Sequence, residues 1–97
     1  MNNMLVYTMP DKLLHKQGKL PNDEDYSESG EYYWRLSSQP KQKIDKIYFA
    51  TEGFIRGYFD VIECDENDVV FDSRSWKDVK LVKQKPFQGF KYIGDVK

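Results

Sequence analysis

The clearest structural pattern in the chain lies in Ile47-Tyr-Phe-Ala-Thr-Glu-Gly-Phe-Ile-Arg-Gly-Tyr-Phe-Asp-Val-Ile62. Two runs rich in β-branched and aromatic residues, the composition typical of strands, flank Glu52 and Gly53. Because glycine adopts positive φ angles without steric cost, this pair predicts the tight turn of a β-hairpin. Gly57, in the middle of the second run, predicts a bulge, a bend or the close approach of another backbone.

Further strands are expected on both sides of this hairpin, at residues 4–9, 69–71, 79–83 and 90–93. Residues 32–36 form either a strand or one helical turn, and Asp11 is placed to cap a short helix that ends at Gly18. Turn signals recur at the spacing of small barrels and sandwiches. The sequence therefore predicts an α+β, mainly β domain of about five to six mostly antiparallel strands with one or two short helices.

Length and composition predict one small domain spanning residues 1–97. Aromatic residues make up 15% of the chain, which supplies enough large apolar side chains for a small core. A single cysteine excludes an internal disulfide, and the N-terminus lacks the pattern of a signal peptide. No apolar run reaches 18 residues, so the sequence predicts a cytoplasmic protein without a membrane segment and leaves the oligomeric state open.

The net charge of −1 conceals an uneven distribution. Residues 74–97 carry seven Lys and Arg against two Asp, whereas residues 1–73 carry eight basic against 14 acidic side chains. The basic end is suited to attract an anionic partner, although both ends are equally consistent with ordinary solvated surface. Residues 21–31 hold five acids and no base, which predicts a mobile acidic loop.

Three short motifs resemble the PUA-like superfamily, which includes the ASCH and EVE domains. Residues 47–57 have the form apolar-Tyr-Phe-x-x-x-Gly-x-Ile-x-Gly, similar to a central hairpin of that group. Phe71-Asp-Ser-x-Ser-Trp76 and Pro86-Phe-x-Gly-Phe90 resemble its closing strands. A further, looser match, Tyr33-Trp34 before Pro40, is similar to the aromatic entry of EVE-type domains, so the similarity covers about residues 32–93. The resemblance implies a small pseudo-barrel that binds RNA, modified bases or nucleotides. The ASCH signature Gly-x-Lys-x-x-x-Glu-x-Arg is missing after Gly18, so a hydrolase-like role is not implied.

Aromatic and basic side chains are the main candidates for a binding surface. Single-stranded nucleic acids need flat rings for base stacking and cations beside their phosphates. A domain this small also needs rings for its core, and strand alternation assigns Phe49, Phe59 and Phe71 to it. The candidate ligand-binding residues are Trp34, Arg35, Tyr48, Ser73, Arg74, Ser75, Trp76, Lys85, Phe87 and Lys91, of which Trp34, Trp76 and Phe87 are equally suited to the core.

Residues 73–76 place two hydroxyls, a guanidinium and an indole within four positions. Such a group is suited to one wall of a phosphate or base pocket. The alternative is a local turn in which the serines bond to the backbone and Trp76 closes one end of the barrel.

No catalytic residue, metal site or cofactor is predicted. The carboxylates between residues 60 and 72 surround an expected exposed turn, and His15 and Cys64 have no partner motif. Cys64 is expected to be a small buried residue. An enzymatic alternative would pair Asp60 or Asp72 with Arg74 in a cleft.

These observations favour a non-enzymatic domain that binds RNA, single-stranded DNA or a nucleotide. The alternative is a small protein-interaction or inhibitor module, of the kind that phages and mobile elements encode, that uses the acidic loop to imitate a phosphate backbone. In the first case, binding is expected to be modest and strongly salt-dependent.

Overall fold

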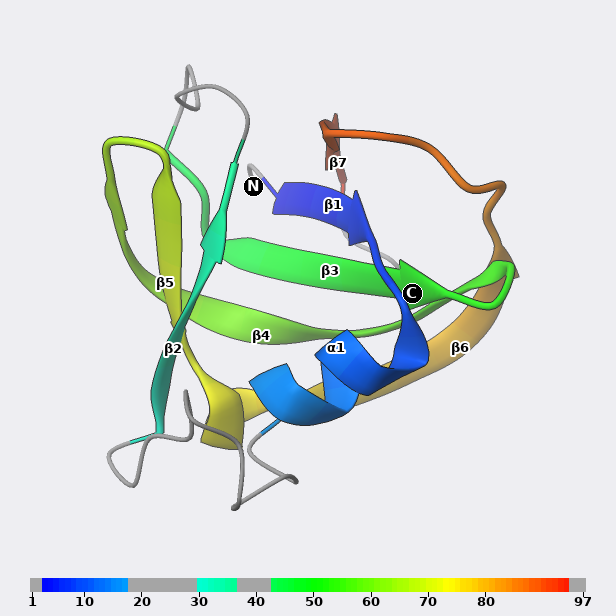
Figure 1. The fold of residues 1–97 in the computed structure, drawn as a ribbon, viewed down its shortest axis with the longest axis horizontal. Helices are drawn as coiled ribbons and strands as arrows, with labels where there is room; N and C mark the ends of the chain where they lie inside the picture. The colour runs from blue at the N-terminus through cyan, green and yellow to red at the C-terminus, as the bar shows by residue number, and fades with distance from the viewer. Residues whose placement is uncertain (1–2, 18–29, 37–42, 95–97) are drawn as a thin grey trace.

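A computed structural model describes residues 3–17, 30–36 and 43–94 of the chain. Seven strands, one α-helix and one 3-10 turn make up this part of the protein (Figure 1). In chain order they are β1 (Asn3–Tyr7), α1 (Pro10–Lys16), β2 (Glu31–Arg35), β3 (Lys46–Thr51), β4 (Phe54–Asp65), β5 (Asp68–Asp72), η1 (Ser73–Ser75), β6 (Lys77–Lys83) and β7 (Phe90–Ile93).

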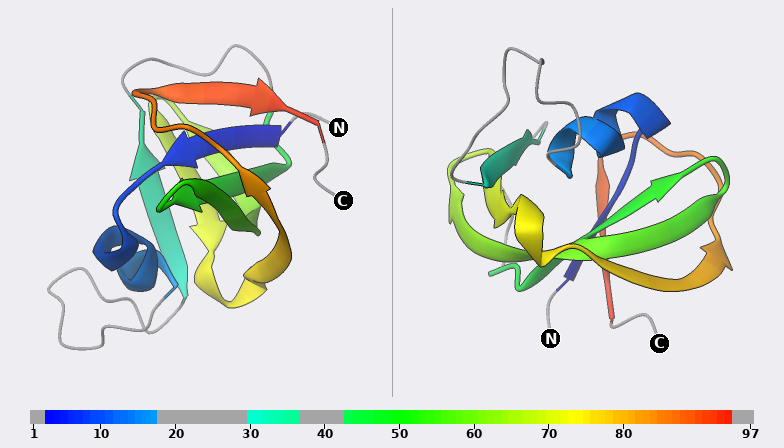
Figure 2. Two further views of the ribbon diagram at one scale, coloured as in Figure 1. Left: turned by 90° about the vertical axis from the view of Figure 1, so that its right-hand side faces the viewer. Right: turned by 90° about the horizontal axis from the view of Figure 1, so that it is seen from below.

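The strands form one mixed sheet in the order β2-β5-β4-β3-β1-β7, and β6 pairs with β4. Only β1 and β3 run parallel, and every other pairing in this sheet is antiparallel. The sheet curls strongly, so that β2 and β5 cross the direction of β1 and β3 (Figures 1 and 2). Its two ends, β2 and β7, share no strand pairing among the described residues.

The long strand β4 connects the two parts of the curl. Its first half pairs with β3 on one side and with β6 on the other, while residues 61–65 pair with β5. The register of both pairings shifts between Ile55 and Gly57 of β4, opposite Phe49 and Ala50 of β3 on one edge and opposite β6 on the other. These irregularities and the close approach of the Lys77 carbonyl to Gly57 confirm the expectation for that glycine.

One face of the sheet carries the first core, which α1 helps to cover through Leu13. Phe59 and Phe71 stack with ring centroids 4.5 Å apart, and Phe49 meets Phe59 edge to face at 5.4 Å. All three rings are fully buried, which confirms the assignment from strand alternation. The buried members of the first core are Met4, Val6, Leu13, Tyr32, Leu36, Ile44, Ile47, Phe49, Phe59, Val69 and Phe71.

The opposite face carries a second core of Leu5, Tyr48, Ala50 and Ile55. Partly buried side chains from β6, from β7 and from the segment between them pack against it, including Val79, Phe87 and Ile93. Because both faces of the central strands β1 and β3 are covered, these strands read as nearly continuous apolar runs.

The predicted mainly β fold is confirmed, and each expected strand and the Glu52–Gly53 turn are present. Both turn residues have positive φ angles, 54° and 87°, as a type I′ hairpin requires. The predicted number of strands was too low, because residues 32–36 form β2 rather than a helical turn. Most of the predicted acidic loop lies outside the described residues. Within the part that the structure describes, no helix is long and apolar enough to cross a membrane.

Candidate functional site

A pocket of about 330 Å³ lies where the two ends of the sheet approach each other. The end of β2 contributes one wall, the segment that leads into β7 contributes the other, and Tyr7 comes from the end of β1. Its volume is near the lower limit of ligand pockets, about 300 Å³. The lining residues are Tyr7, Trp34, Arg35, Leu36, Phe87, Gln88, Gly89 and Phe90.

Four aromatic side chains line this pocket, and packing holds each of them in place. Trp34 meets Phe49 of the first core edge to face at 5.2 Å, and Phe90 packs against the same core. Phe87 meets Tyr7 edge to face at 6.0 Å, and both rings pack against the second core. The pocket therefore has rigid walls of partly buried rings, which is suitable for stacking on a flat ligand.

Three cations accompany these rings. Arg35 donates two hydrogen bonds to the carboxylate of Asp68, at 3.0 and 3.2 Å, and this contact raises the pKa of the guanidinium. The Arg35 side chain is nevertheless 73% exposed. The Lys16 ammonium lies 6.0 Å from the centroid of Trp34, and that of Lys91 lies 4.6 Å from the centroid of Phe87. An anionic group on a ligand would therefore meet positive charge at the pocket.

The structure brings together three predicted binding residues, Trp34, Arg35 and Phe87, with Lys91 beside them. Lys85 lies outside this pocket and lines a neighbouring groove. The prediction of Tyr48 as a stacking face is wrong, because this residue is only 1% exposed. Its ring belongs to the second core because β3 lies between β1 and β4, and both of its faces are covered.

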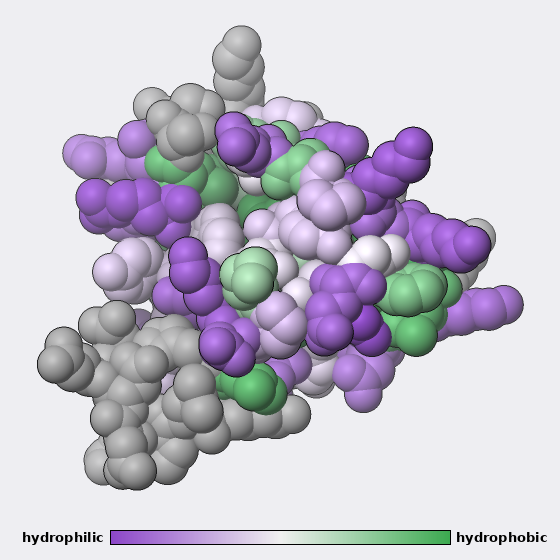
Figure 3. Space-filling view, turned by 45° about the vertical axis from the view of Figure 1, so that its right-hand side comes forward, coloured by the Kyte–Doolittle hydropathy of each residue, from purple (hydrophilic) through white to green (hydrophobic). Residues whose placement is uncertain are grey.

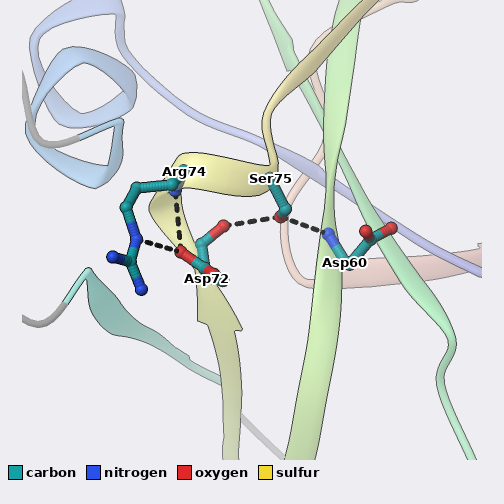
Figure 4. A network of polar contacts seen from close by, with 4 residues as sticks. All are labelled: Asp60, Asp72, Arg74 and Ser75. Atoms are coloured by element: carbon teal, nitrogen blue, oxygen red, sulfur yellow. Dashed lines mark hydrogen bonds and ion pairs between the residues drawn. The ribbon is translucent and has the colours of Figure 1, made fainter.

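Within residues 73–76, Arg74 and Ser75 form a separate polar network with Asp72 and Asp60 at the end of β5 (Figure 4). The Asp72 carboxylate accepts hydrogen bonds from the backbone N–H of Arg74 at 2.9 Å and from its Nε at 3.2 Å. The Ser75 hydroxyl donates to the Asp72 carbonyl at 2.6 Å and accepts from the Asp60 amide at 2.8 Å. These bonds make the local turn that is the alternative to a pocket wall.

The side chains of this turn have different environments. Ser73 is buried, Arg74 is exposed, and Trp76 is partly buried against Phe59 at 4.8 Å. The Trp76 N–H donates to Asp78 at 2.8 Å. None of residues 73–76 lines the pocket beside Trp34, and a direct role of theirs in binding stays a prediction.

Of the two carboxylates that the enzymatic alternative would pair with Arg74, only that of Asp72 contacts it. Asp60 enters the network through its backbone amide, and its carboxylate points away from Arg74 (Figure 4). The pKa of Asp72 is lowered, first by the backbone N–H of Arg74 and then by its side chain. Asp72 therefore holds its proton weakly and acts as an acceptor for the turn.

The expectation for Cys64 was wrong, because this residue is exposed. It lies near the end of β4, where it pairs with Val69 of β5 close to the turn between the two strands. Partial burial raises the pKa of its thiol, which makes it a weak nucleophile at neutral pH. No group of three or more potential metal ligands occurs among the residues that the structure describes.

Sequence reasoning missed five pocket residues, Tyr7, Leu36, Gln88, Gly89 and Phe90. Local patterns assign Tyr7 only to a strand, and Phe90 only to the start of another. At the pocket β1 ends and β7 begins, but the pairing of these two strands is not visible in local sequence patterns. A usable signal was Gly89, which has a φ of 79° and sets the turn between the two phenylalanines. Comparisons with protein-family models, with curated proteins and with solved structures give no match for this chain.

Proposed function

We propose that this protein binds a nucleotide or a single-stranded nucleic acid, with one base held in the aromatic pocket. The observation that carries the proposal is the convergence of four rings and Arg35 in one pocket of about 330 Å³. Aromatic rings that are already fixed by packing stack on a base at little cost in conformational entropy. The motifs that resemble the PUA-like superfamily are consistent with this proposal.

The charges beside the pocket are consistent with a phosphate-bearing ligand. Arg35 offers a planar guanidinium suited to bidentate contact with a phosphate, while Lys91 adds a compact positive charge beside Phe87. Asp68 holds Arg35 in the free protein, so a phosphate would compete with this carboxylate. The lining residues include no carboxylate, histidine or cysteine, and the proposed role is therefore binding without catalysis.

Fluorescence anisotropy with labelled mixed-sequence RNA and DNA oligonucleotides at low salt tests the proposal. Substitution of Trp34 by Ala is expected to weaken binding about 5- to 150-fold, the loss of one stacked base at about 1–3 kcal/mol. Because Trp34 also packs on Phe49, thermal unfolding of the variant must be measured, and Trp34→Phe should retain most binding. Ile62→Ala, which removes a large apolar side chain that is 52% exposed and outside the pocket lining, is the control.

The absence of binding at about 100 µM protein in low salt would contradict the proposal, because nonspecific nucleic-acid binding alone reaches dissociation constants of about 1–100 µM at physiological salt. Equal binding by the Trp34→Ala variant and the wild-type protein would also contradict it. That result would show that the aromatic pocket takes no base.

A further inference from the structure

A second hollow of about 530 Å³ adjoins the aromatic pocket. It forms where the turn of the β3–β4 hairpin meets the segment that follows β6. A backbone hydrogen bond of 2.9 Å from the Gln84 amide to the Gly53 carbonyl holds the two segments together. The lining residues of this groove, which we call the hairpin groove, are Gly53, Phe54, Lys83, Gln84, Lys85 and Pro86.

The aromatic pocket and the hairpin groove share a boundary. The amide of Gly53, in the groove, donates a hydrogen bond of 2.6 Å to the hydroxyl of Tyr7, in the pocket. Pro86 lines the groove and Phe87, the next residue, lines the pocket. A ligand that leaves the pocket beside Tyr7 and Phe87 therefore arrives directly at the groove.

The hairpin groove combines an aromatic ring with positive charge. Phe54 is partly buried, and the Arg56 guanidinium lies 5.4 Å from its ring centroid. Lys83, Lys85 and Pro86 are exposed along the opposite side. Glu52, in the hairpin turn, places one negative charge near the groove. The three cations Arg56, Lys83 and Lys85 outnumber it, so the local charge is positive. Figure 3, which brings this side of the molecule forward, shows several small hydrophobic patches separated by hydrophilic side chains.

We infer that the ligand is a single strand of at least two nucleotides rather than a mononucleotide, an inference that rests on the proposed function. One base occupies the aromatic pocket, and the next stacks in the hairpin groove on Phe54. The phosphates that join the nucleotides lie near Lys85 and Lys83. The lining surface is largely apolar, and it is the continuity with the aromatic pocket and the two lysines along the groove that favour a nucleic acid over an apolar peptide segment as the occupant.

A length series tests this inference. The wild-type protein is titrated with AMP and UMP, and with di-, tetra- and octanucleotides of RNA and DNA. Affinity should rise at least tenfold between one and four nucleotides. Phe54→Ala should weaken tetranucleotide binding about 5- to 150-fold and leave mononucleotide binding unchanged. Lys85→Ala should make the slope of log affinity against log salt shallower by about one unit, the effect of one lost phosphate contact. Lys80→Ala, an exposed lysine on β6 outside the groove lining, is the control.

The outcomes separate this inference from the proposed function. The inference would be overturned if the protein bound one and four nucleotides equally well and neither Phe54→Ala nor Lys85→Ala changed binding. The aromatic pocket would then remain as a base site. Failure of every nucleotide to bind the wild-type protein would overturn both. If NMR signals of Phe54 shift with a peptide of alternating Glu and Val but not with the oligonucleotides, the groove is a peptide site and the inference is wrong.

Discussion

The indole ring of Trp76 packs directly against Gly57. A Cβ atom at position 57 would overlap both this ring and the carbonyl oxygen of Lys77. The same ring packs on Phe59 and donates its N–H to Asp78, so it covers β4 and is anchored at its polar edge. Gly57 therefore permits the contact that joins the start of β6 to the central strand.

Substitution of Gly57 by Ala is expected to destabilise the protein by about 1–3 kcal/mol, because the added methyl group forces Trp76 and the β6 backbone apart. Chemical denaturation measured by tryptophan fluorescence checks this value. Gly94→Ala is the control, since a methyl group at that position would meet no atom within 4 Å and the φ of Gly94 is not in the left-handed region. A Gly57→Ala variant as stable as the Gly94→Ala variant would show that β6 adjusts freely.

Substitution of Asp68 by Asn is expected to strengthen binding of single-stranded nucleic acid. The change removes the carboxylate that holds the Arg35 guanidinium and leaves this cation available to a phosphate. The slope of log affinity against log salt should steepen by about one contact, and the thermal midpoint should change little because the pair is exposed. Glu66→Gln, which removes a nearby charge without a hydrogen bond to Arg35, is the control. Weaker binding by Asp68→Asn would mean that Asp68 positions Arg35 productively.

Cys64 is expected to react with a thiol reagent in the folded protein, but more slowly at neutral pH than an unstructured cysteine. Its side chain is exposed, while partial burial raises its pKa and so lowers the thiolate fraction. The reaction rate with 5,5′-dithiobis(2-nitrobenzoic acid) should continue to increase with pH above the range where a free thiol levels off. The same titration in denaturant provides the reference. Identical pH profiles in the two conditions would contradict the raised pKa.

The Asp72 carboxyl is expected to titrate below the ordinary range for aspartate. Its charged form accepts hydrogen bonds in the folded protein, so its stabilising effect is complete above the unfolded-state pKa and is lost as pH falls through the lowered, folded-state pKa. Carboxyl-detected NMR titration measures this directly. Arg74→Ala should leave most of the shift, because the backbone N–H of residue 74 is its largest cause. Ordinary titration of Asp72 would contradict the bond seen in the turn.

Local patterns predicted the elements of this fold well because each carries its own signal. The alternation of Ile47 and Phe49 with Tyr48 assigned the faces of β3, and Gly53 predicted the turn, in which Glu52 also has a positive φ angle. The same alternation could not show that the second face is also covered. It therefore predicts Tyr48 on the surface, although Val79, Phe87 and Ile93 bring a second layer over it.

The candidate site was only partly predictable, because it depends on pairing between distant segments. Trp34, Arg35 and Phe87 were recognised by residue type, but their meeting requires the ends of β2 and β7 to approach each other. Ser75 illustrates the opposite case, since its hydroxyl bonds to the nearby Asp72 carbonyl, as the local-turn alternative predicts, and to the more distant Asp60 amide. Residue chemistry identified suitable side chains, while the curl of the sheet determined which of them line the pocket.

The double pairing of β4 has a consequence for how the protein loses its structure. Residues 54–60 support β3 and β6, and residues 61–65 of the same strand support β5 and, through it, β2. If either group of strands separates from β4, then β4 loses the hydrogen bonds to that group. The other group pairs with the same strand and is destabilised as well. We therefore expect β3, β5 and β6 to unfold together with β4 in one cooperative step, and the β2 wall of the aromatic pocket to be lost with them.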